Sequence, residues 1–282
     1  PPAEIALSNP LSEEQSAMRT TLLGSLLDVA RHNLDRDTNS VALFESGRIY
    51  GPSVGAPSGG PLAGSFAGEQ PAPFTERHRL GCLAIGSIVP KTWRGEGEVV
   101  DFFAMKGALE GLAGQLGVTL GFEKSSKPFL HPGRAAQVLV GATDAGWIGE
   151  MHPLVCRGWD LDAAVGFEVE LAVLVAAATA GEERFEDVTS YPAVYRDLAV
   201  EVEQTTSAAD VQSEIRSAAG EFLVSAQIFD LYEGDQVGRG RKSLAFRLTF
   251  KAADRTLTDD DVGRSMTTIE NRLKMFGGSI RE

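Results

Sequence analysis

The stretch RDLAVEVEQTTSAADVQSEIRSAAGEF, residues 196–222, decides the fold of the C-terminal part of the chain. Its first eight residues place Leu198, Val200 and Val202 in alternation with small or charged residues, which predicts a half-buried strand. Ser207 then stands three residues before Asp210, as a helix N-cap does, and a helical pattern follows. The stretch therefore predicts a strand that leads directly into a helix.

The residues that follow extend this unit. Two further strands are predicted at 223–234 and 242–252, then a helix at 258–277 and a last strand at 278–282. Thr258 precedes an acidic first turn, and Gly277 closes the helix as a C-cap glycine does. This is the βαββαβ order of the ferredoxin-like fold. Because both helices cover one sheet face, the following residues are expected to point toward them: Leu198, Val200, Val202, Leu244, Phe246, Leu248 and Phe250.

The N-terminal part reads as an antiparallel α+β domain. A long helix is predicted from about Ser12, and its apolar stripe through Met18, Leu22, Leu26 and Val29 is wider than one core contact needs. Burial between layers and contact with another subunit explain that width equally well. Further on, the sequence predicts a strand at 40–50, a flexible Gly/Pro-rich loop at 51–74, a strand at 79–89, a helix capped by Asp101, and strands at 135–141, 146–153 and 164–171.

Composition limits the classes of function. With 282 residues and 43% hydrophobic residues the chain is long enough for two globular domains, and it contains no apolar run of membrane-spanning length. The net charge of -13 argues against binding nucleic acid through bulk positive charge. Cys156 and His152 are a weak basis for a metal site, so no metal is expected. A cytoplasmic protein with no membrane or DNA partner is the default expectation.

Known catalytic patterns do not account for the sequence. The segment GDQVGRGRKS (234–243) resembles a phosphate-binding loop, but it joins two strands, and a basic hairpin tip is the better interpretation. Zinc-protease motifs and dinucleotide-binding glycine motifs are absent from the sequence. The residues by themselves therefore indicate a two-domain α+β binding protein.

A family resemblance adds to this interpretation. Seven ordered blocks carry it, at 9–27 (NPLSEEQSAMRTTLLGSLL), 129–141 (FLHPGRAAQVLVG), 148–153 (IGEMHP), 191–200 (YPAVYRDLAV), 228–234 (IFDLYEG), 242–250 (KSLAFRLTF) and 255–262 (RTLTDDDV). In this order they resemble the C-terminal portion of the bacterial phenylalanyl-tRNA synthetase β subunit. The resemblance implies a non-catalytic class II synthetase-like domain at 1–187 and a ferredoxin-fold anticodon-binding domain at 188–282. Because the sequence begins without methionine, we expect it to be a piece of a longer polypeptide.

The resemblance also implies partners. The family's ligase is an α2β2 assembly that joins phenylalanine to tRNA-Phe, and ATP and magnesium are used in the α subunit. No cofactor is expected in this chain, which lacks the class II signatures for ATP; in FESGRIY (44–50) the glycine and arginine follow the glutamate in the wrong order. The helical stripe is expected to contact the α subunit through Met18, Leu22, Leu26 and Val29.

The open sheet face is the predicted tRNA site. Basic side chains around an exposed aromatic ring are typical of sites for unpaired RNA, although a plain solvated face would show the same pattern. Asp197 is expected to orient Arg196. Replacing Arg196 or Arg247 with alanine should weaken tRNA binding, and this loss of affinity should become smaller as the salt concentration rises. The predicted tRNA-binding residues are Arg196, Phe229, Arg239, Arg241, Lys242, Ser243, Arg247 and Lys251.

Two alternatives belong to other classes of function. A ferredoxin-like module fused to a scaffold domain can act as a small-molecule sensor, and such a sensor needs a groove lined by polar groups. A free-standing ligase-like enzyme is the other alternative, and the missing ATP signatures argue against it.

Overall fold

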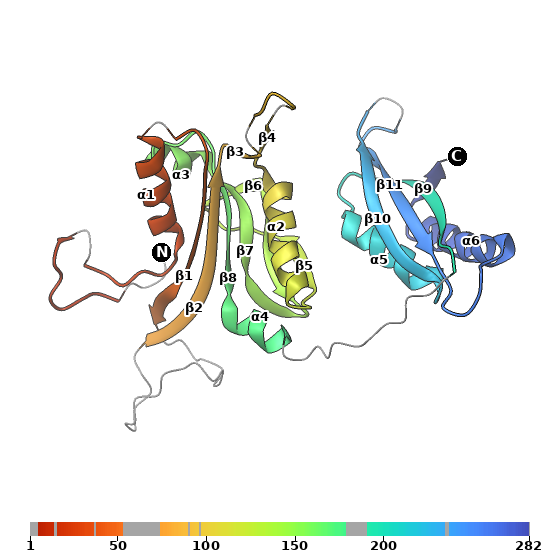
Figure 1. The fold of residues 1–282 in the computed structure, drawn as a ribbon, viewed down its shortest axis with the longest axis horizontal. Coiled ribbons are helices and arrows are strands. Elements are labelled where there is room, and N and C mark those ends of the chain that lie inside the picture. The colour runs from red at the N-terminus through yellow and green to blue at the C-terminus, as the bar shows by residue number, and fades with distance from the viewer. Residues whose placement is uncertain are drawn as a thin grey trace, which may run out of the picture. The chain divides into compact units, whose positions relative to one another are not determined.

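The chain divides into two compact units, Pro1–Glu183 (unit 1) and Arg184–Glu282 (unit 2), which Figure 1 shows in a computed structural model. The structure describes residues 5–13, 16–36, 38–52, 74–89, 91–95, 97–178, 191–234 and 237–281. The expected domain boundary at 187/188 and nearly all of the predicted loop at 51–74 lie outside these ranges. Within them, no helix is both long and apolar enough to cross a membrane.

Unit 1 is built on a six-stranded antiparallel sheet with the order β1-β2-β8-β7-β6-β5. A short hairpin, β3-β4, forms a second sheet. In chain order the elements are α1 (Leu23–Leu34), β1 (Val41–Pro52), β2 (Phe74–Ile85), β3 (Ser87–Val89), β4 (Glu98–Val99), α2 (Phe102–Gln115), β5 (Leu120–Lys124), β6 (Leu130–Val140), β7 (Thr143–Met151), α3 (Pro153–Gly158), β8 (Val165–Glu170) and α4 (Leu171–Ala178).

Both faces of this sheet are covered. One core joins α1 and α3 to side chains such as Leu83 and Trp147, and a second core joins α2 and α4 to Ile148 and Phe167 on the other side. The predicted strands are present, except that the stretch 79–89 is divided at Gly86 between β2 and β3, which belong to different sheets. The predicted helix after Asp101 is confirmed, and the Asp101 side chain accepts a hydrogen bond from the amide of Ala104. Unit 1 is thus a three-layer structure with its sheet in the middle (Figure 1).

The start of the first helix was predicted wrongly. The helix begins at Leu23, not near Ser12, and Met18 lies outside it. Two long-range contacts hold the preceding residues in an extended path. Arg19 donates from Nε to the carbonyl of Arg48 on the edge strand β1, and Glu168 of β8 accepts from the amide of Leu22. These contacts with the sheet therefore outweigh the local capping pattern at Ser12.

The apolar stripe of α1 is mainly internal core. Leu22 is fully buried and Leu26 is 5% exposed, so the structure contradicts their predicted role as subunit contacts. Their side chains pack onto the sheet, where Leu22 and Leu26 lie directly over Gly81. Met18 is half-buried and Val29 is exposed, so these two residues retain surface that another subunit could reach.

Unit 2 confirms the predicted βαββαβ order. Its sheet is antiparallel with the order β10-β11-β9-β12. The elements are β9 (Val194–Glu203), α5 (Ala208–Ala219), β10 (Leu223–Tyr232), β11 (Arg241–Phe250), α6 (Asp259–Met275) and β12 (Ser279–Arg281).

Local sequence signals explain the helices of unit 2. The Ser207 side chain accepts from the amide of Asp210, and Thr258 and Asp261 cap each other reciprocally at the start of α6. Gly277, at φ +94°, follows the last turn of α6, where a residue with a side chain would be strained. The residues predicted to face the helices are all buried in one core with Val211, Ile215, Ile269 and Leu273.

Candidate nucleic-acid interface

The sheet of unit 2 is covered on one face only. Helices α5 and α6 pack on the face that carries the core, and the alternate residues of β9 and β11 point to the other side, here called the open face. Arg247 lies on this face opposite Asp197 of β9 and Gln227 of β10. The open face is where the sequence placed its candidate site.

Arg247 is held from two sides. Its Nε and Nη2 donate to Oδ1 and Oδ2 of Asp197 at 2.9 and 2.8 Å, which makes a bidentate pair. Its guanidinium carbon also lies 5.1 Å from the centre of the Phe229 ring. The hydrogen bonds from Arg247 hold the pKa of Asp197 below its ordinary value, so this carboxylate is ionised at neutral pH. The predicted pairing of Phe229 with a cation on the open face is thus present.

A β-bulge brings Phe229 to this position. The register of β10 against β11 shifts between Ile228 and Asp230, and Phe229 is the additional residue. Its ring is 54% exposed, although it lies beside Arg247. Sequence alternation alone would not fix the side of a bulged residue.

Sequence reasoning missed two aromatic residues. By register, Tyr195 and Tyr232 lie on the open face, opposite Thr249 and Ser243 respectively, and both are exposed. Counting alternate residues backward from Asp197 would have found Tyr195. Tyr232 required knowledge of the bulge.

Arg196 differs from the prediction. It lies opposite the buried Leu248 and therefore belongs to the helix-covered side of the sheet, at its end. Its Nη2 donates to Asp259 at the start of α6 at 3.2 Å, and Nη1 donates to the carbonyl of Tyr195. Asp197 orients Arg247, not Arg196, because strand neighbours point to opposite faces.

The remaining predicted residues are spread around the β10-β11 hairpin. Arg239 is exposed at its tip, and Arg241 donates to the carbonyl of Glu201 and to the Ser279 hydroxyl. Lys242 lies opposite the buried Val202, hence toward the helix-covered side. Ser243 is 7% exposed and offers little surface, while Lys251 is half-buried just beyond β11.

The open face is not strongly basic. The register places four carboxylates on the same side as its cations, namely Asp197, Glu201, Glu203 and Asp230. A ligand would therefore be held by stacking and by individual hydrogen bonds more than by bulk charge.

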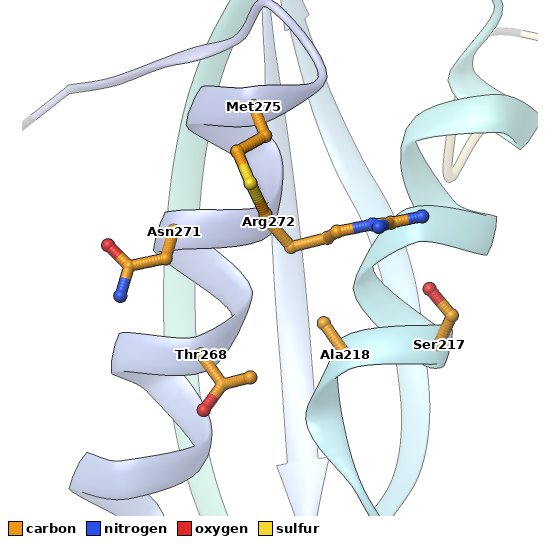
Figure 2. Close-up of a pocket in the computed structure, with 6 residues that line it drawn as sticks. All are labelled: Ser217, Ala218, Thr268, Asn271, Arg272 and Met275. Carbon is orange, nitrogen blue, oxygen red and sulfur yellow. The ribbon is translucent and has the colours of Figure 1, made fainter.

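Two hollows are formed by described residues of unit 2. A cleft of about 400 Å³ is lined by Tyr195, Arg196, Asp197 and Arg247. A groove of about 410 Å³ lies between α5 and α6, where the Arg272 side chain reaches from α6 toward α5 (Figure 2). Its lining residues are Ser217, Ala218, Thr268, Asn271, Arg272 and Met275. Of these two, the cleft is the one lined by Arg247, the residue that contacts Phe229.

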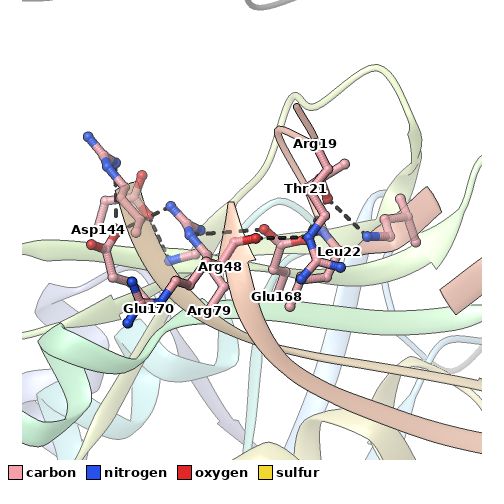
Figure 3. Close-up of polar contacts among 11 residues, drawn as sticks. Arg19, Thr21, Leu22, Arg48, Arg79, Asp144, Glu168 and Glu170 are labelled. Carbon is pink, nitrogen blue, oxygen red and sulfur yellow. Dashed lines mark hydrogen bonds and ion pairs between the residues drawn. The ribbon is translucent and has the colours of Figure 1, made fainter. Parts of the chain in front are cut away.

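Unit 1 holds a buried polar cluster around Glu168 (Figure 3). The carboxylate is 3% exposed and accepts from the amide of Leu22 and the hydroxyl of Thr21. Arg79 pairs with Glu170 at 3.3 Å and approaches Glu168 at 4.0 Å, while its Nε has no hydrogen-bond partner. The cluster fastens the start of α1 to β8.

This cluster does not fit a nucleotide. Leu22 and Trp147 fill the sheet face beside Glu168, and both are buried. Two carboxylates, Glu168 and Glu170, would face any phosphate placed there. Among the described residues, no group of three or more His, Cys, Asp or Glu side chains is arranged to hold a metal ion. His152 instead caps α3 by accepting from the amide of Leu154.

Comparisons with known proteins agree with this division. Residues 2–171 match the family described as the phenylalanyl-tRNA synthetase beta chain CLM domain, and residues 189–281 match the ferredoxin-fold anticodon binding domain. A pyrrolysyl-tRNA synthetase structure from Desulfitobacterium hafniense aligns over 61% of this chain and 53% of its own, at 16% identity and a TM-score of 0.40, which is too distant to support a conclusion.

The curated relatives are named as beta subunits of phenylalanine–tRNA ligase. The chain is 37% identical over 279 residues to the phenylalanine–tRNA ligase beta subunit of Symbiobacterium thermophilum, which covers 98% of this chain and 30% of the relative. It is 39% identical over 288 residues to that of Moorella thermoacetica, covering 99% of this chain and 33% of the relative. The chain thus spans about a third of the length of these relatives. With a fold, an ordered set of motifs and two family matches in agreement, the chain belongs to the phenylalanyl-tRNA synthetase beta chain family.

Proposed function

We propose that this chain is the part of a phenylalanine–tRNA ligase β subunit that supports assembly with the α subunit and binds the anticodon region of tRNA-Phe. The observation that carries the proposal is the exposed Phe229 ring beside Arg247, on the open face of the unit that matches an anticodon-binding family. Unpaired RNA bases stack on such aromatic and guanidinium surfaces. Aminoacylation by the α2β2 holoenzyme in the cytoplasm, with ATP and magnesium, is part of the proposal.

The proposed contacts fall into two groups. Phe229 and Arg247 offer a stacking surface on the open face, with Ser243 and Lys251 on the same strand side. Arg196, Arg239, Arg241 and Lys242 lie at the ends of the sheet, where they would contact phosphates. Because Arg196 is anchored to Asp259, it would contact RNA from the end of the sheet and not from its face.

The proposed contact with the α subunit is narrower than the sequence suggested. Met18 and Val29 retain accessible surface, whereas Leu22 and Leu26 would act only by keeping α1 in place. Mixing the chain with a cognate α subunit and tRNA-Phe, followed by size-exclusion chromatography, tests the assembly. Val29→Asp should reduce co-elution with the α subunit without lowering thermal stability, because Val29 is exposed.

The chain is proposed to have no ATP-dependent activity of its own. The buried, acidic sheet face around Glu168 supports this. Measurable pyrophosphate exchange by the purified chain would contradict it.

Binding of RNA hairpins tests the proposed tRNA role. The chain should bind the anticodon arm of tRNA-Phe more tightly than the acceptor arm of the same tRNA. Arg239→Ala should weaken binding and lower the slope of log K against log salt by about 0.7, the value for one phosphate contact on a single strand. Arg216→Ala is the matched control, since Arg216 is exposed on α5, on the helix-covered side. Equal affinity for both arms would refute the proposal.

A sensor function would use the groove between α5 and α6. Its volume is in the range of small-ligand pockets, and polar groups line part of it. A thermal-shift screen with amino acids tests it, and stabilisation that is lost in Asn271→Ala would support it.

A further inference from the structure

The Arg247 side chain is held in position more tightly than attraction through its positive charge alone would require. Three neighbouring strands contribute to its position: Asp197 from β9 takes two of its N–H groups, β11 carries it, and β10 presents the Phe229 ring through a bulge. A salt bridge between side chains this exposed contributes little to folding. The arrangement therefore fixes the orientation of the guanidinium more than it stabilises unit 2.

The bidentate pair also changes what Arg247 can bind. Its charge is already balanced by the Asp197 carboxylate, and the N–H groups of one edge are occupied. A phosphate would have to compete with that carboxylate for the cation. The Arg247 side chain is 53% exposed although it lies beside the Phe229 ring, and planar stacking is a property of arginine that lysine lacks.

Space for a ligand lies directly beside it. The cleft of about 400 Å³ is lined by Arg247, Asp197 and Arg196, and also by Tyr195, whose ring is exposed on the same face two residues before Asp197. Planar groups therefore border a hollow that is large enough for one nucleotide. Both arginines of the cleft are already paired with carboxylates, Arg247 with Asp197 and Arg196 with Asp259, which makes phosphate binding there less favourable.

We propose that Arg247 is a stacking platform for one unpaired nucleobase, and that Asp197 is the positioning residue that holds the platform flat beside Phe229. The base lies in the cleft that Arg247 and Tyr195 line. This inference rests on the proposed function, since the base belongs to the anticodon loop. It revises the sequence-based expectation for Arg247, whose contribution to binding persists at high salt because it does not come from counterion release.

Asp197→Asn distinguishes two possible roles of Asp197, because they predict opposite changes in RNA affinity. If Asp197 were only an acidic residue near a polyanion, its neutralisation would strengthen RNA binding, most of all at low salt. If it positions Arg247, the same change weakens binding by roughly threefold or more, because asparagine replaces one of the two accepting oxygens with an NH2 donor and the bidentate pair is lost. The matched control is Glu203→Gln on the same strand and face, away from Arg247, which should leave binding unchanged or slightly tighter.

Arg247→Lys tests the stacking role independently of the fold. It keeps the positive charge but removes the planar group, so it should weaken binding of the anticodon arm about tenfold, close to Arg247→Ala. A thermal melt of each variant should stay close to that of the unsubstituted chain. If Arg247 instead binds a phosphate, Arg247→Lys should retain most of the affinity for the hairpin. The loss of affinity in Arg247→Ala should then become smaller as the salt concentration rises.

The experiment uses the chain with anticodon-arm hairpins that carry 2-aminopurine at single loop positions. One position should show quenching with the unsubstituted chain and lose it in both Arg247→Lys and Asp197→Asn. If the unsubstituted chain does not bind the hairpin, the proposed function fails and this inference fails with it. If the chain binds but Asp197→Asn binds more tightly, or Arg247→Lys binds equally well, only this inference is overturned.

Discussion

The two sheets of this chain differ in how many of their faces are covered. The sheet of unit 1 has a hydrophobic core on each side, and even the Glu168 carboxylate on it is buried. The sheet of unit 2 has one core, and the other face presents aromatic rings and ion pairs to solvent. The faces of a sheet enclosed on both sides are filled by core side chains, whereas the open face of a half-covered sheet can receive a ligand without disrupting a core. The open face of unit 2 is therefore where we place the proposed RNA-binding residues, whereas the sheet faces of unit 1 are occupied by its two cores.

Leu22→Asp should give the largest effect. It places a carboxylate at a fully buried position, which costs more than about 5 kcal/mol of folding free energy and unfolds unit 1. Hydrogen exchange should show unit 1 amides losing protection while unit 2 amides keep theirs. If Leu22 instead lay in a subunit interface, the variant chain would fold normally by itself and fail only to bind its partner.

Glu168→Ala should destabilise unit 1 by about 3 kcal/mol, because it leaves the amide of Leu22 and the Thr21 hydroxyl without their acceptor. Chemical denaturation monitored by Trp147 fluorescence measures the change, since Trp147 lies in the adjoining core. Glu168→Gln is the matched control and should cost less, because its amide oxygen can still accept. Equal costs would show that the charge, and not the hydrogen bonds, matters.

Phe229→Ala should weaken binding of the anticodon arm by about 1–3 kcal/mol with little dependence on salt, as expected for loss of a stacked ring. Unit 2 should keep its stability, because the ring is exposed. Phe229→Leu separates stacking from apolar contact, since it keeps volume without a ring and should lose nearly as much affinity. Titrations at two salt concentrations measure both variants, and an affinity equal to that of the unsubstituted chain would make the open face a plain surface.

Thr258→Ala should have the smallest effect, a loss of about 1 kcal/mol in the stability of unit 2, because it removes the N-cap of α6. Thermal unfolding of unit 2 measures it. The stability of unit 1 should be unaffected, because the lost cap belongs to unit 2 alone.

The same cap gives a pH dependence. Hydrogen bonds from Arg255 and from Thr258 hold the pKa of Asp261 far below its ordinary value. A carboxyl whose pKa is lower in the folded state stabilises the fold above its unfolded pKa of about 3.9, and this contribution is lost as the pH falls toward the folded pKa. Asp261→Asn should therefore destabilise unit 2 at pH 7, and the difference should shrink in acid below about pH 4. A difference that stays constant down to the most acidic measurable pH would contradict this account.

Much of the fold could be predicted from local patterns. Alternation in 198–202 and 244–250 identified the core of unit 2, and Asp101, Ser207 and Thr258 marked helix starts where the structure has them. These signals depend on neighbours within a few residues, so they do not need the tertiary structure. The family resemblance, confirmed by the matches at 2–171 and 189–281, also came from the sequence.

The sequence by itself determined the order of elements in unit 2, the helix-facing core of that unit and the family, because periodicity, capping and ordered motifs are recorded in consecutive residues. Only the tertiary structure decided where α1 begins, since Glu168 and Arg48 act on it from distant strands. It also decided that Asp197 holds Arg247 and that Phe229 lies beside it, because strand register and a β-bulge set those contacts. Register depends on the pairing of whole strands, and no local pattern in a single strand records it.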